Sequence, residues 1–392
     1  MTNKLSPEKR IDLTAGLIAV VAIIIFWFAG ANRSEKDIYP VLKEAAGNKV
    51  IIGGGSAGIW LARDSASDHP DSFISPGTGE GYGGEMRVVT VVDALGYIER
   101  IIIHTHRETE SFMKKVIRKG FLAQFEGLPS NSELMGGKDI DIISGATLTS
   151  AGLAMAIRDG AHKIALTSLG LEVPPYQPGR FILKYIDIAW LALLVLAFIT
   201  ATVRTKRQPL LRWTVMIISL FVLGFQLNAQ LSISQFNKAI LGYWPEWHTQ
   251  LYFYIMLLGL LSLILFTGKN HYCDRICPFG TVQEIIGKIS GAKTRNTGKF
   301  GRPLKWIQRL LALALIITAL IGRNPSQANY EVFGAMFKLT GNTLQFSLLL
   351  LAAIGSLIIR RPWCGYLCPV RPVNDFAVSF RSFIKTLITP SG

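Results

Sequence analysis

Six long apolar segments constrain this chain more than any other feature of its sequence. Each is about as long as the ~20 residues that a helix needs to cross a hydrocarbon core of ~30 Å. The segments lie roughly at residues 13–31, 181–203, 213–231, 249–267, 304–322 and 342–360. We therefore expect an integral membrane protein with six transmembrane helices.

Lys and Arg residues are distributed unevenly over the connections between these segments. Residues 204–212 carry four basic residues and residues 268–306 carry eight, whereas the connections at 232–248 and 323–341 together hold three. Cytoplasmic connections retain Lys and Arg. The alternation therefore predicts that both termini are cytoplasmic and that residues 32–180 lie outside the cytoplasm.

The formal net charge of +15 would suit a protein that binds nucleic acid or one that faces anionic lipid. Because the basic residues follow the predicted topology, we expect membrane lipid as a partner and no nucleic acid. We expect a multi-pass protein of the cell inner (cytoplasmic) membrane in three parts. Residues 1–34 form a cytoplasmic N-terminus and membrane anchor, residues 35–176 an extracytoplasmic domain, and residues 177–392 a five-helix membrane domain.

The first apolar segment also resembles a signal peptide. It is longer than the ~7–15 apolar residues that such peptides usually contain, and this favours an uncleaved anchor.

Three glycines near the start of the outer domain have the spacing of a dinucleotide-binding motif. They are Gly53, Gly55 and Gly58. That motif requires a strand–helix–strand unit with an acidic residue about 20 positions further on, whereas a polar segment follows here. We therefore interpret the glycines as a turn.

The outer domain contains patterns typical of an α+β fold. Two β-rich runs at 86–92 and 97–104 predict a hairpin, and a helix is expected around 108–120. Small and hydroxyl residues at 144–150 then precede an apolar-periodic helix. The first turn of such a helix favours a phosphate group, although Ser and Thr at this position more often serve as an N-cap.

The string Asp141-x-x-Ser144-Gly145-Ala146-Thr147-x-Thr149 resembles the covalent flavinylation motif of FMN-binding domains in the sodium-pumping NADH:quinone reductase and in Rnf complexes. The resemblance extends to residues 81–84, 106–109 and 124–127. It implies an extracytoplasmic FMN-binding domain between the first and second transmembrane helices, FMN joined to Thr149 as a phosphoester, and a flavin transferase as partner. The implied FMN-binding residues are Asp141, Ser144, Gly145, Ala146, Thr147, Thr149, Glu108 and Thr109. Relatives often have Pro-Gly where this chain has Glu110-Ser111, so the loop near the flavin ring is expected to differ.

All four cysteines lie in two matching C-x-x-x-C-P motifs. They are Cys273, Cys277, Cys364 and Cys368. Each motif follows an apolar segment that exits into the cytoplasm, where a reducing environment argues against disulfides. The repeated spacing favours a metal centre with four cysteine ligands over unligated thiols. An iron–sulfur cluster is the first choice, with zinc or copper as alternatives.

A double C-x-x-x-C-P membrane domain behind an outer FMN domain resembles the NosR/NirI family. It also resembles shorter membrane flavoproteins encoded with reductive dehalogenases. NosR proteins usually add a ferredoxin module, and the sequence has no further cysteines that could form one. The resemblance is therefore greater to the short form.

A flavin outside and cysteines at the cytoplasmic side would be separated by ~30 Å, which predicts an intermediate carrier. Histidines suitable for a transmembrane haem are absent from the apolar segments, so we expect a quinone. The polar residues expected to contact it are Asp187, Gln226, Asn228, Gln230, His248 and, on the inner side, His271. Each could instead anchor a helix at the interface or bond between helices.

Together these features predict a membrane electron-transfer flavoprotein, either a quinol dehydrogenase or a subunit of an oxidoreductase complex. Electrons would pass from the quinone pool or a cytoplasmic-side donor through the iron–sulfur centre and FMN. An extracytoplasmic redox protein or other subunits of a membrane complex would receive them. The alternatives are a redox-sensing regulator, which could signal through the basic amphipathic segment 376–388, and a metal or cofactor maturation factor.

Overall fold

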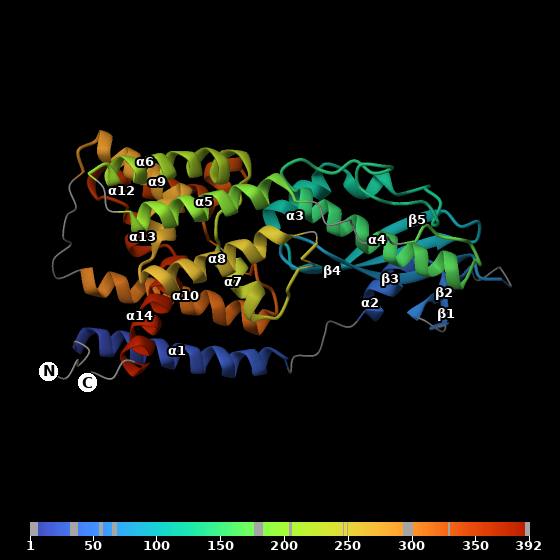
Figure 1. The fold of residues 1–392 in the computed structure, drawn as a ribbon. Helices are drawn as coiled ribbons and strands as arrows, with labels where there is room; N and C mark the ends of the chain where they lie inside the picture. The colour runs from blue at the N-terminus through green and yellow to red at the C-terminus, as the bar shows by residue number, and fades with distance from the viewer. Residues whose placement is uncertain are drawn as a thin grey trace.

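The computed structural model describes residues 7–31, 38–54, 58–64, 69–175, 183–203, 206–245, 247–248, 250–292, 301–327 and 330–388. A domain built on a β-sheet and a bundle of helices lie end to end (Figure 1). The domain boundaries predicted at 34/35 and 176/177 fall outside the described residues. Those boundaries therefore stay predictions.

In the described part of the chain, five antiparallel strands form one sheet in the order β1-β2-β3-β4-β5. They are β1 (Val50–Gly54), β2 (Trp60–Arg63), β3 (Ser72–Glu80), β4 (Glu85–Asp93) and β5 (Ile98–Thr105). The predicted hairpin is confirmed as β4–β5, where Val88 pairs with Ile103 and Val92 with Ile98.

The glycine-rich segment contributes to an antiparallel pair. Gly53 pairs with Leu61 and Gly54 with Trp60 across β1 and β2. A dinucleotide-binding unit needs parallel strands joined by a helix, so this pairing excludes one here. Gly55 lies outside the described residues.

Helices cover both faces of the sheet (Figure 1). They are α2 (Tyr39–Ala46), α3 (Glu110–Arg118), the short 3₁₀ helix η2 (Phe121–Gln124) and α4 (Thr147–Thr167). Leu42 of α2 packs with Val89 and Val91 on one face, while Leu153 and Ile157 of α4 pack with other strand residues on the opposite face. The helix predicted at 108–120 is confirmed as α3.

Glycines let α4 approach β3 closely. A Cβ atom added to Gly77 would lie 2.0 Å from the carbonyl oxygen of Ala156, and one added to Gly79 would lie 2.1 Å from that of Gly152. Side chains larger than hydrogen at these positions would push the helix off the sheet. The close contact fixes where the first turn of α4 lies.

Long apolar helices form the bundle. They are α1 (Pro7–Ala31), α5 (Tyr185–Thr202), α6 (Gln208–Ser219) with its π-helical continuation η3 (Leu220–Gln226), α8 (Leu251–Thr267), α10 (Gly301–Gly322) and α12 (Thr343–Ile358). Among the described residues, four are long and apolar enough to span a membrane: α1, α5, α6 with η3, and α10. The shorter apolar helices α8 and α12 coincide with the other two predicted segments.

The third predicted span is too long. The helix ends at Gln226 rather than near residue 231, and Asn228 takes a left-handed conformation with φ of 50°. Ala229 and Leu231 are nevertheless buried. Residues 227–231 are therefore an apolar loop, which hydropathy alone does not distinguish from the end of a helix.

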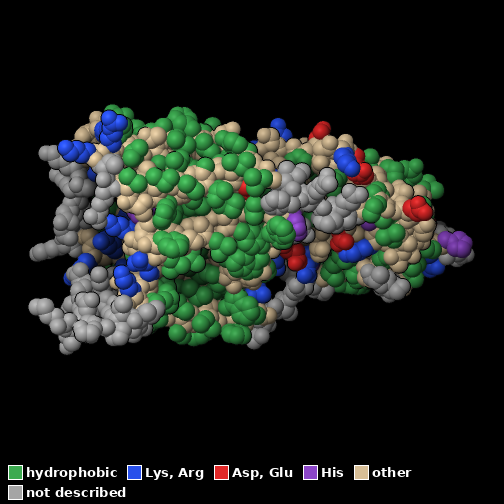
Figure 2. Space-filling view, in the orientation of Figure 1, with side chains coloured by type: hydrophobic (Ala, Val, Ile, Leu, Met, Phe, Trp, Pro, Cys, Tyr) green, Lys and Arg blue, Asp and Glu red, His purple; other side chains and the backbone are tan. Residues whose placement is uncertain are grey.

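Short helices complete the bundle. They are α7 (Ile233–Ile240), the π-helical turn η4 (Tyr272–Ile276), α9 (Pro278–Ile289), α11 (Phe333–Lys338), α13 (Pro362–Tyr366) and α14 (Val370–Ile388). The basic helix α14 crosses the bundle and packs against α1, α8 and α10. On the face shown in Figure 2, Lys and Arg side chains gather at the end of the bundle remote from the sheet, and hydrophobic side chains cover its middle.

Candidate functional site

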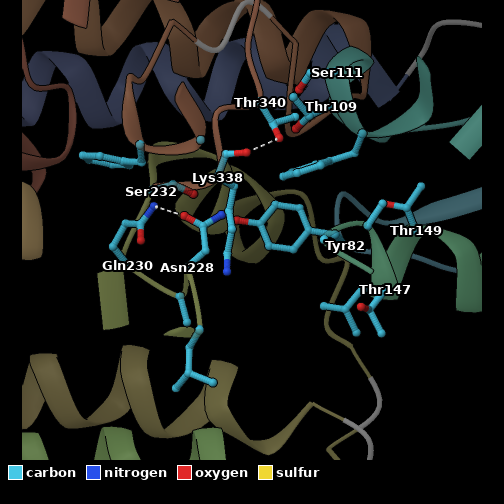
Figure 3. Close-up of a pocket in the computed structure, with 18 of the residues that line it drawn as sticks. Tyr82, Thr109, Ser111, Thr147, Thr149, Asn228, Gln230, Ser232, Lys338 and Thr340 are labelled. Atoms are coloured by element: carbon cyan, nitrogen blue, oxygen red, sulfur yellow. Dashed lines mark hydrogen bonds between the residues drawn. The ribbon is translucent and has the colours of Figure 1, made fainter. Parts of the chain in front are cut away.

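A cavity of about 400 Å³ lies where the sheet domain meets the bundle. Its walls combine Tyr82, residues 109–112 and the first turn of α4 with the loop 227–232 and residues around α11. In Figure 3, Thr147 and Thr149 project from one side and Asn228, Gln230 and Ser232 from the other, with Tyr82 between them. The volume lies within the ~300–1,000 Å³ typical of small-molecule sites.

Thr149 is bound to a buried carboxylate. Its hydroxyl donates a hydrogen bond of 2.5 Å to Oε2 of Glu108, and Oε1 of Glu108 accepts the backbone N–H of Gly83 at 2.7 Å. Thr149 is only 1% exposed and Glu108 only 2%. Burial raises the pKa of Glu108, although the hydrogen bonds from Thr149 and Gly83 oppose that change. The hydroxyl therefore lies beside a group with increased proton affinity.

The first turn of α4 faces the cavity without a side-chain cap. Ala146 occupies the N-cap position and makes no capping bond. The hydroxyl of Ser150 instead accepts the N–H of Ile143 and donates to the carbonyl of Ala146. The N-cap explanation for the hydroxyl cluster is therefore not realised, and the helix end is directed at the cavity, where a phosphate would be favoured.

The structure separates the predicted FMN-binding residues into two groups. Thr109, Gly145, Ala146, Thr147 and Thr149 line the cavity, and Glu108 lies directly behind Thr149.

Asp141 and Ser144 are exposed and do not line the cavity. The backbone of Asp141 exchanges two hydrogen bonds with the side chain of Gln124, at 2.8 and 3.2 Å. Asp141 therefore holds the loop before α4 in place rather than contacting the cavity.

Lys238 and Tyr82 join the two parts of the molecule. Tyr82 lies in the segment 81–84 marked by the sequence resemblance, whereas no motif marks Lys238. The Nζ atom of Lys238 donates to the carbonyl oxygens of Gly81 and Tyr82 at 3.4 Å each, and Lys238 is 3% exposed. Burial lowers the pKa of Lys238, while the charges of Glu80 and Glu108 oppose this. Burial also raises the pKa of Tyr82 to about 12. The available signal was a lone Lys in a connection poor in basic residues.

Only some of the predicted quinone contacts reach the cavity. Asn228 and Gln230 line it and share a hydrogen bond of 3.1 Å. Gln226 accepts a hydrogen bond from Tyr185 at 3.3 Å.

Asp187, His248 and His271 are not among the residues that line the cavity. Asp187 accepts the N–H of Lys184 and so closes the first turn of α5. His248 lies against the ring of Trp247, and His271 is buried two residues before Cys273. These contacts of Asp187 and His248 fit a structural role, such as anchoring a helix at the interface, better than a role in binding a quinone.

The two cysteine motifs converge inside the bundle. Cys273 lies in η4, Cys277 at the N-terminus of α9, Cys364 in α13 and Cys368 just after it. The thiol of Cys368 interacts electrostatically with those of Cys273, Cys277 and Cys364. All four are free thiols. In the described residues, no group of three or more His, Cys, Asp or Glu is arranged to hold a metal ion.

The cysteine site lies close to one wall of the cavity, whereas the sequence predicts a separation of ~30 Å between flavin and cysteines. The hydroxyl of Tyr272 accepts the N–H of Leu231 at 2.8 Å, and Leu231 lies between two residues that line the cavity. Tyr272 directly precedes Cys273. One tyrosine side chain and one peptide unit of ~3.8 Å therefore connect the cavity wall to the first cysteine.

A second tyrosine, Tyr330, also connects the cavity region to the cysteine site. The hydroxyl of Tyr330 donates to the carbonyl of Leu367 at 2.5 Å, next to Cys368. The following residue, Glu331, lines the cavity and interacts electrostatically with Cys368. The loop 227–231, which bonds to Tyr272, thus connects the cavity to the cysteine site.

Comparison with known proteins agrees with this arrangement. Residues 81–162 match the family model of the FMN-binding domain, and residues 249–297 and 343–387 match that of a 4Fe-4S binding domain. The chain therefore joins an FMN-binding domain to a ferredoxin-type 4Fe-4S domain and contains several helices suited to a membrane. Among the metals considered above, the 4Fe-4S match favours iron and sulfur.

The chain is distantly similar to three curated proteins. Protein NirI of Paracoccus denitrificans is 28% identical over 183 residues, covering 42% of this chain and 27% of NirI. The putative electron transport protein YccM of Escherichia coli is 30% identical over 146 residues, covering 33% and 39%. The ferredoxin-type protein NapH of Haemophilus influenzae is 28% identical over 126 residues, covering 30% and 42%. The matched regions thus span between 27% and 42% of these relatives.

Proposed function

We propose that this protein transfers electrons between a 4Fe-4S cluster bound by its four cysteines and an FMN esterified to Thr149 in the cavity. The observation that carries the proposal is the wall shared by the two sites. Glu331 lines the cavity and its charge acts on the thiol of Cys368, and Tyr272, which precedes Cys273, bonds to the loop 227–232 that lines the cavity. If the two carriers occupy these adjoining sites, electrons would pass between them without a third carrier.

The cavity fits the chemistry of FMN. The first turn of α4 would favour a phosphate beside Thr149, and Tyr82 and Phe112 offer aromatic surface to a planar ring. Lys184 and Lys338 add positive charge to the cavity wall. When bound, FMN supplies the ability to accept electrons in pairs and release them singly. Glu108 holds the hydroxyl of Thr149 at the position where the ester would form.

The cysteine site fits a cluster that carries negative charge. The guanidinium group of Arg361 donates to the carbonyl of Cys273 at 2.7 Å, and that of Arg371 donates to the carbonyl of Cys364 at 3.1 Å. Positive charge near thiolate ligands stabilises them and helps to set a cluster's reduction potential. The cluster supplies one-electron transfer, and these side chains position its ligands.

We also propose that six helices span the cell inner membrane, with α8 and α12 completing the set. The FMN domain would lie on the periplasmic or outer side of that membrane. The Lys and Arg residues at the remote end of the bundle (Figure 2) support a cytoplasmic location for that end. We propose that the quinone pool or a cytoplasmic-side donor reduces the protein and that an extracytoplasmic redox partner, or another subunit of a complex, oxidises it. The similarity to YccM, a putative electron transport protein, supports this role.

Mass spectrometry of protein produced with its flavin transferase tests the flavin assignment. An FMN-sized adduct is expected on the peptide that contains Thr149. It should be absent from Thr149→Val and present in Thr147→Val, which alters the neighbouring hydroxyl of the same cavity. An adduct that persists in Thr149→Val would refute the attachment site.

Reduction by a quinol analogue tests the path of electrons. In wild-type protein containing flavin and iron, the flavin absorbance should bleach. In Cys364→Ser, which removes one proposed ligand, bleaching should slow greatly if electrons enter through the cluster. Equal rates in both proteins would contradict that order, and a flavin that stays oxidised would count against a quinol donor.

A further inference from the structure

The two cysteine motifs are followed by amide side chains at equivalent positions. Gln283 lies ten residues after Cys273, and Asn374 lies ten residues after Cys364. Both amides are buried, with exposed fractions of 1% and 4%. The repeat therefore extends beyond the cysteines and prolines that define it in the sequence.

Each amide contacts a sulfur of the other motif. Nε2 of Gln283 donates to Sγ of Cys364 at 3.3 Å, and Nδ2 of Asn374 donates to Sγ of Cys273 at 3.9 Å. The contacts are reciprocal, because each half of the repeat supplies a donor to the first cysteine of the other half. Such an exchange is expected when two related halves pack around one shared centre.

The orientation of the Gln283 amide is determined by its neighbours. Its oxygen accepts the backbone N–H of Trp363 at 2.9 Å, and its nitrogen also reaches the carbonyl of Phe279 at 3.3 Å. The opposite assignment of oxygen and nitrogen would break both bonds. The NH₂ group must therefore face Cys364.

Gln283 also lies in apolar surroundings. It borders an apolar cavity of about 320 Å³ together with Phe279, Phe346 and Leu350. A hydrogen bond in such a region is electrostatically stronger than one in water.

Other side chains around the cysteines contact the backbone. Nε2 of Gln308 donates to the carbonyls of Cys364 and Cys368 at 3.2 and 2.8 Å. Among the described side chains, Gln283 and Asn374 donate hydrogen bonds to cysteine sulfurs. The backbone N–H groups of Phe279 and Gly280 bond to the thiol of Cys277. The side chains near the cysteines therefore differ in their targets. Gln308 bonds to backbone carbonyls, whereas Gln283 and Asn374 bond to sulfur atoms that would be cluster ligands.

We infer that Gln283 and Asn374 are paired positioning residues that raise the reduction potential of the cluster by donating hydrogen bonds to the thiolates of Cys364 and Cys273. A donor to a thiolate draws electron density from the sulfur and so stabilises the reduced cluster, which carries the greater negative charge. The inference rests on the proposed function, because it requires the cluster. It also assigns the two halves of the repeat a joint effect on one redox centre.

The test is an EPR-monitored redox titration of the purified full-length protein. In Gln283→Met, the ratio of reduced to oxidised cluster at a fixed ambient potential should fall up to about tenfold, which is ~59 mV for a one-electron couple. Asn374→Leu should shift the potential in the same direction but less, because its contact is longer. The matched control Gln308→Met removes an equally buried amide that contacts only carbonyls, and its potential should stay near that of wild type.

Iron and sulfide analysis accompanies each titration. A Gln283→Met protein with full iron and sulfide content and an unchanged potential would overturn the inference, and so would an equal shift in Gln308→Met. If Gln283→Met does not retain the cluster, the test depends on Asn374→Leu. A lower reduction potential in that variant supports the inference, and an unchanged or higher potential overturns it. A wild-type protein without any four-iron signal would refute the proposed function itself, a result distinct from an unshifted variant.

Discussion

Thr149 and Glu108 form the contact on which the flavin assignment depends. The two side chains are buried together, and the hydroxyl donates directly to the carboxylate. In the proposed attachment, the hydroxyl oxygen of Thr149 would bond to the phosphorus of an activated flavin phosphate supplied by the flavin transferase, and the bond from that phosphorus to the donor's leaving group would break. The hydroxyl would lose its proton, which a carboxylate at hydrogen-bond distance can accept. Glu108 is therefore placed to act as the base when the flavin is attached.

Replacing Glu108 with Gln should slow flavin attachment by ~10²-fold, the lower end of general-base contributions. Burial raises the pKa of Glu108 above the ordinary value of 4.5. The carboxylate fraction, and hence the wild-type rate, should therefore rise with pH through this elevated pKa, whereas the amide variant should lack that rise. The measurement is the initial rate of FMN incorporation against pH, at a fixed amount of flavin transferase.

Glu110→Gln is the matched control for this variant. Its side chain is 73% exposed and lies only two residues from Glu108, so its rate and pH profile should follow those of wild type. Equal rates for Glu108→Gln and wild type at every pH would show that the base lies elsewhere.

At the level of elements, one buried carboxylate of α9 forms ion pairs with arginines of neighbouring segments. Glu284 is 2% exposed, and both of its oxygens accept hydrogen bonds from Arg212 of α6 at 2.9 and 2.8 Å. Arg360 and Arg361, between α12 and α13, pair with it as well. Burial alone would raise the pKa of Glu284, but the three guanidinium groups lower it to about 2.

Replacing Glu284 with Gln should destabilise the bundle by about 3–5 kcal/mol, because it removes the buried carboxylate with which three guanidinium groups pair. Asp274→Asn is the control, since Asp274 also pairs with Arg212 but is 46% exposed. Its cost should be about 0–1 kcal/mol. Thermal or denaturant unfolding in detergent measures both, and similar values for the two variants would contradict this account.

The pH dependence follows from the lowered pKa of Glu284. The ion group stabilises the fold above the ordinary Glu value of 4.5, and this contribution is lost as the pH falls from 4.5 towards 2. Wild type should therefore lose its stability advantage over Glu284→Gln across that interval. A constant difference between the two proteins from pH 6 to pH 3 would show that the carboxylate charge is not responsible.

Periodicity and hydropathy predict individual elements well where a local pattern decides the conformation. The hairpin β4–β5, the helix α3 and the positions of the apolar helices follow from such patterns. The end of η3 at Gln226 does not, because residues 227–231 include apolar positions and stay buried without being helical. Tyr272, distant in sequence, accepts the N–H of Leu231 in that loop.

Candidate site residues likewise divide into those that a local motif predicts and those that it does not. Thr149 and its neighbours in the first turn of α4 were predictable because a motif marks them. Exposed Asp141 belongs to that motif, yet its backbone bonds to Gln124 serve the loop. Gln283 and Asn374 belong to no recognisable motif, and their role emerges only when the two halves of the repeat are packed together.

For the whole molecule, the decisive feature is how the FMN-binding domain meets the bundle. The nearness of the cysteines to the cavity could not be predicted from hydropathy, which places every cytoplasmic-side motif a full membrane thickness from an outer domain. Lys238 of the bundle stabilises this junction by donating hydrogen bonds to two carbonyls of the loop at residues 81–84 in the FMN-binding domain. Because this lysine is buried, its loss leaves two carbonyl acceptors without that donor.

Lys238→Met should loosen this junction by about 1–3 kcal/mol, the cost of leaving buried acceptors unsatisfied. Hydrogen–deuterium exchange of peptides covering residues 81–84 and 109–112 should become faster, while the centre of the sheet keeps its protection. Lys163→Met is the control, because Lys163 pairs with Asp159 on the same helix, α4, and is 42% exposed. Unchanged exchange at residues 81–84 would show that Lys238 does not secure the domain.

The central claim is that flavin and cluster share a wall and exchange electrons directly. A cryo-electron microscopy structure of the flavinylated, iron-loaded protein tests it most directly by locating both groups. We predict FMN density continuous with Thr149 inside the cavity, four-iron density among Cys273, Cys277, Cys364 and Cys368, and no third cofactor between them. A flavin on a different face of the domain, or cysteine pairs bound to separate metals and facing away from the cavity, would contradict the account.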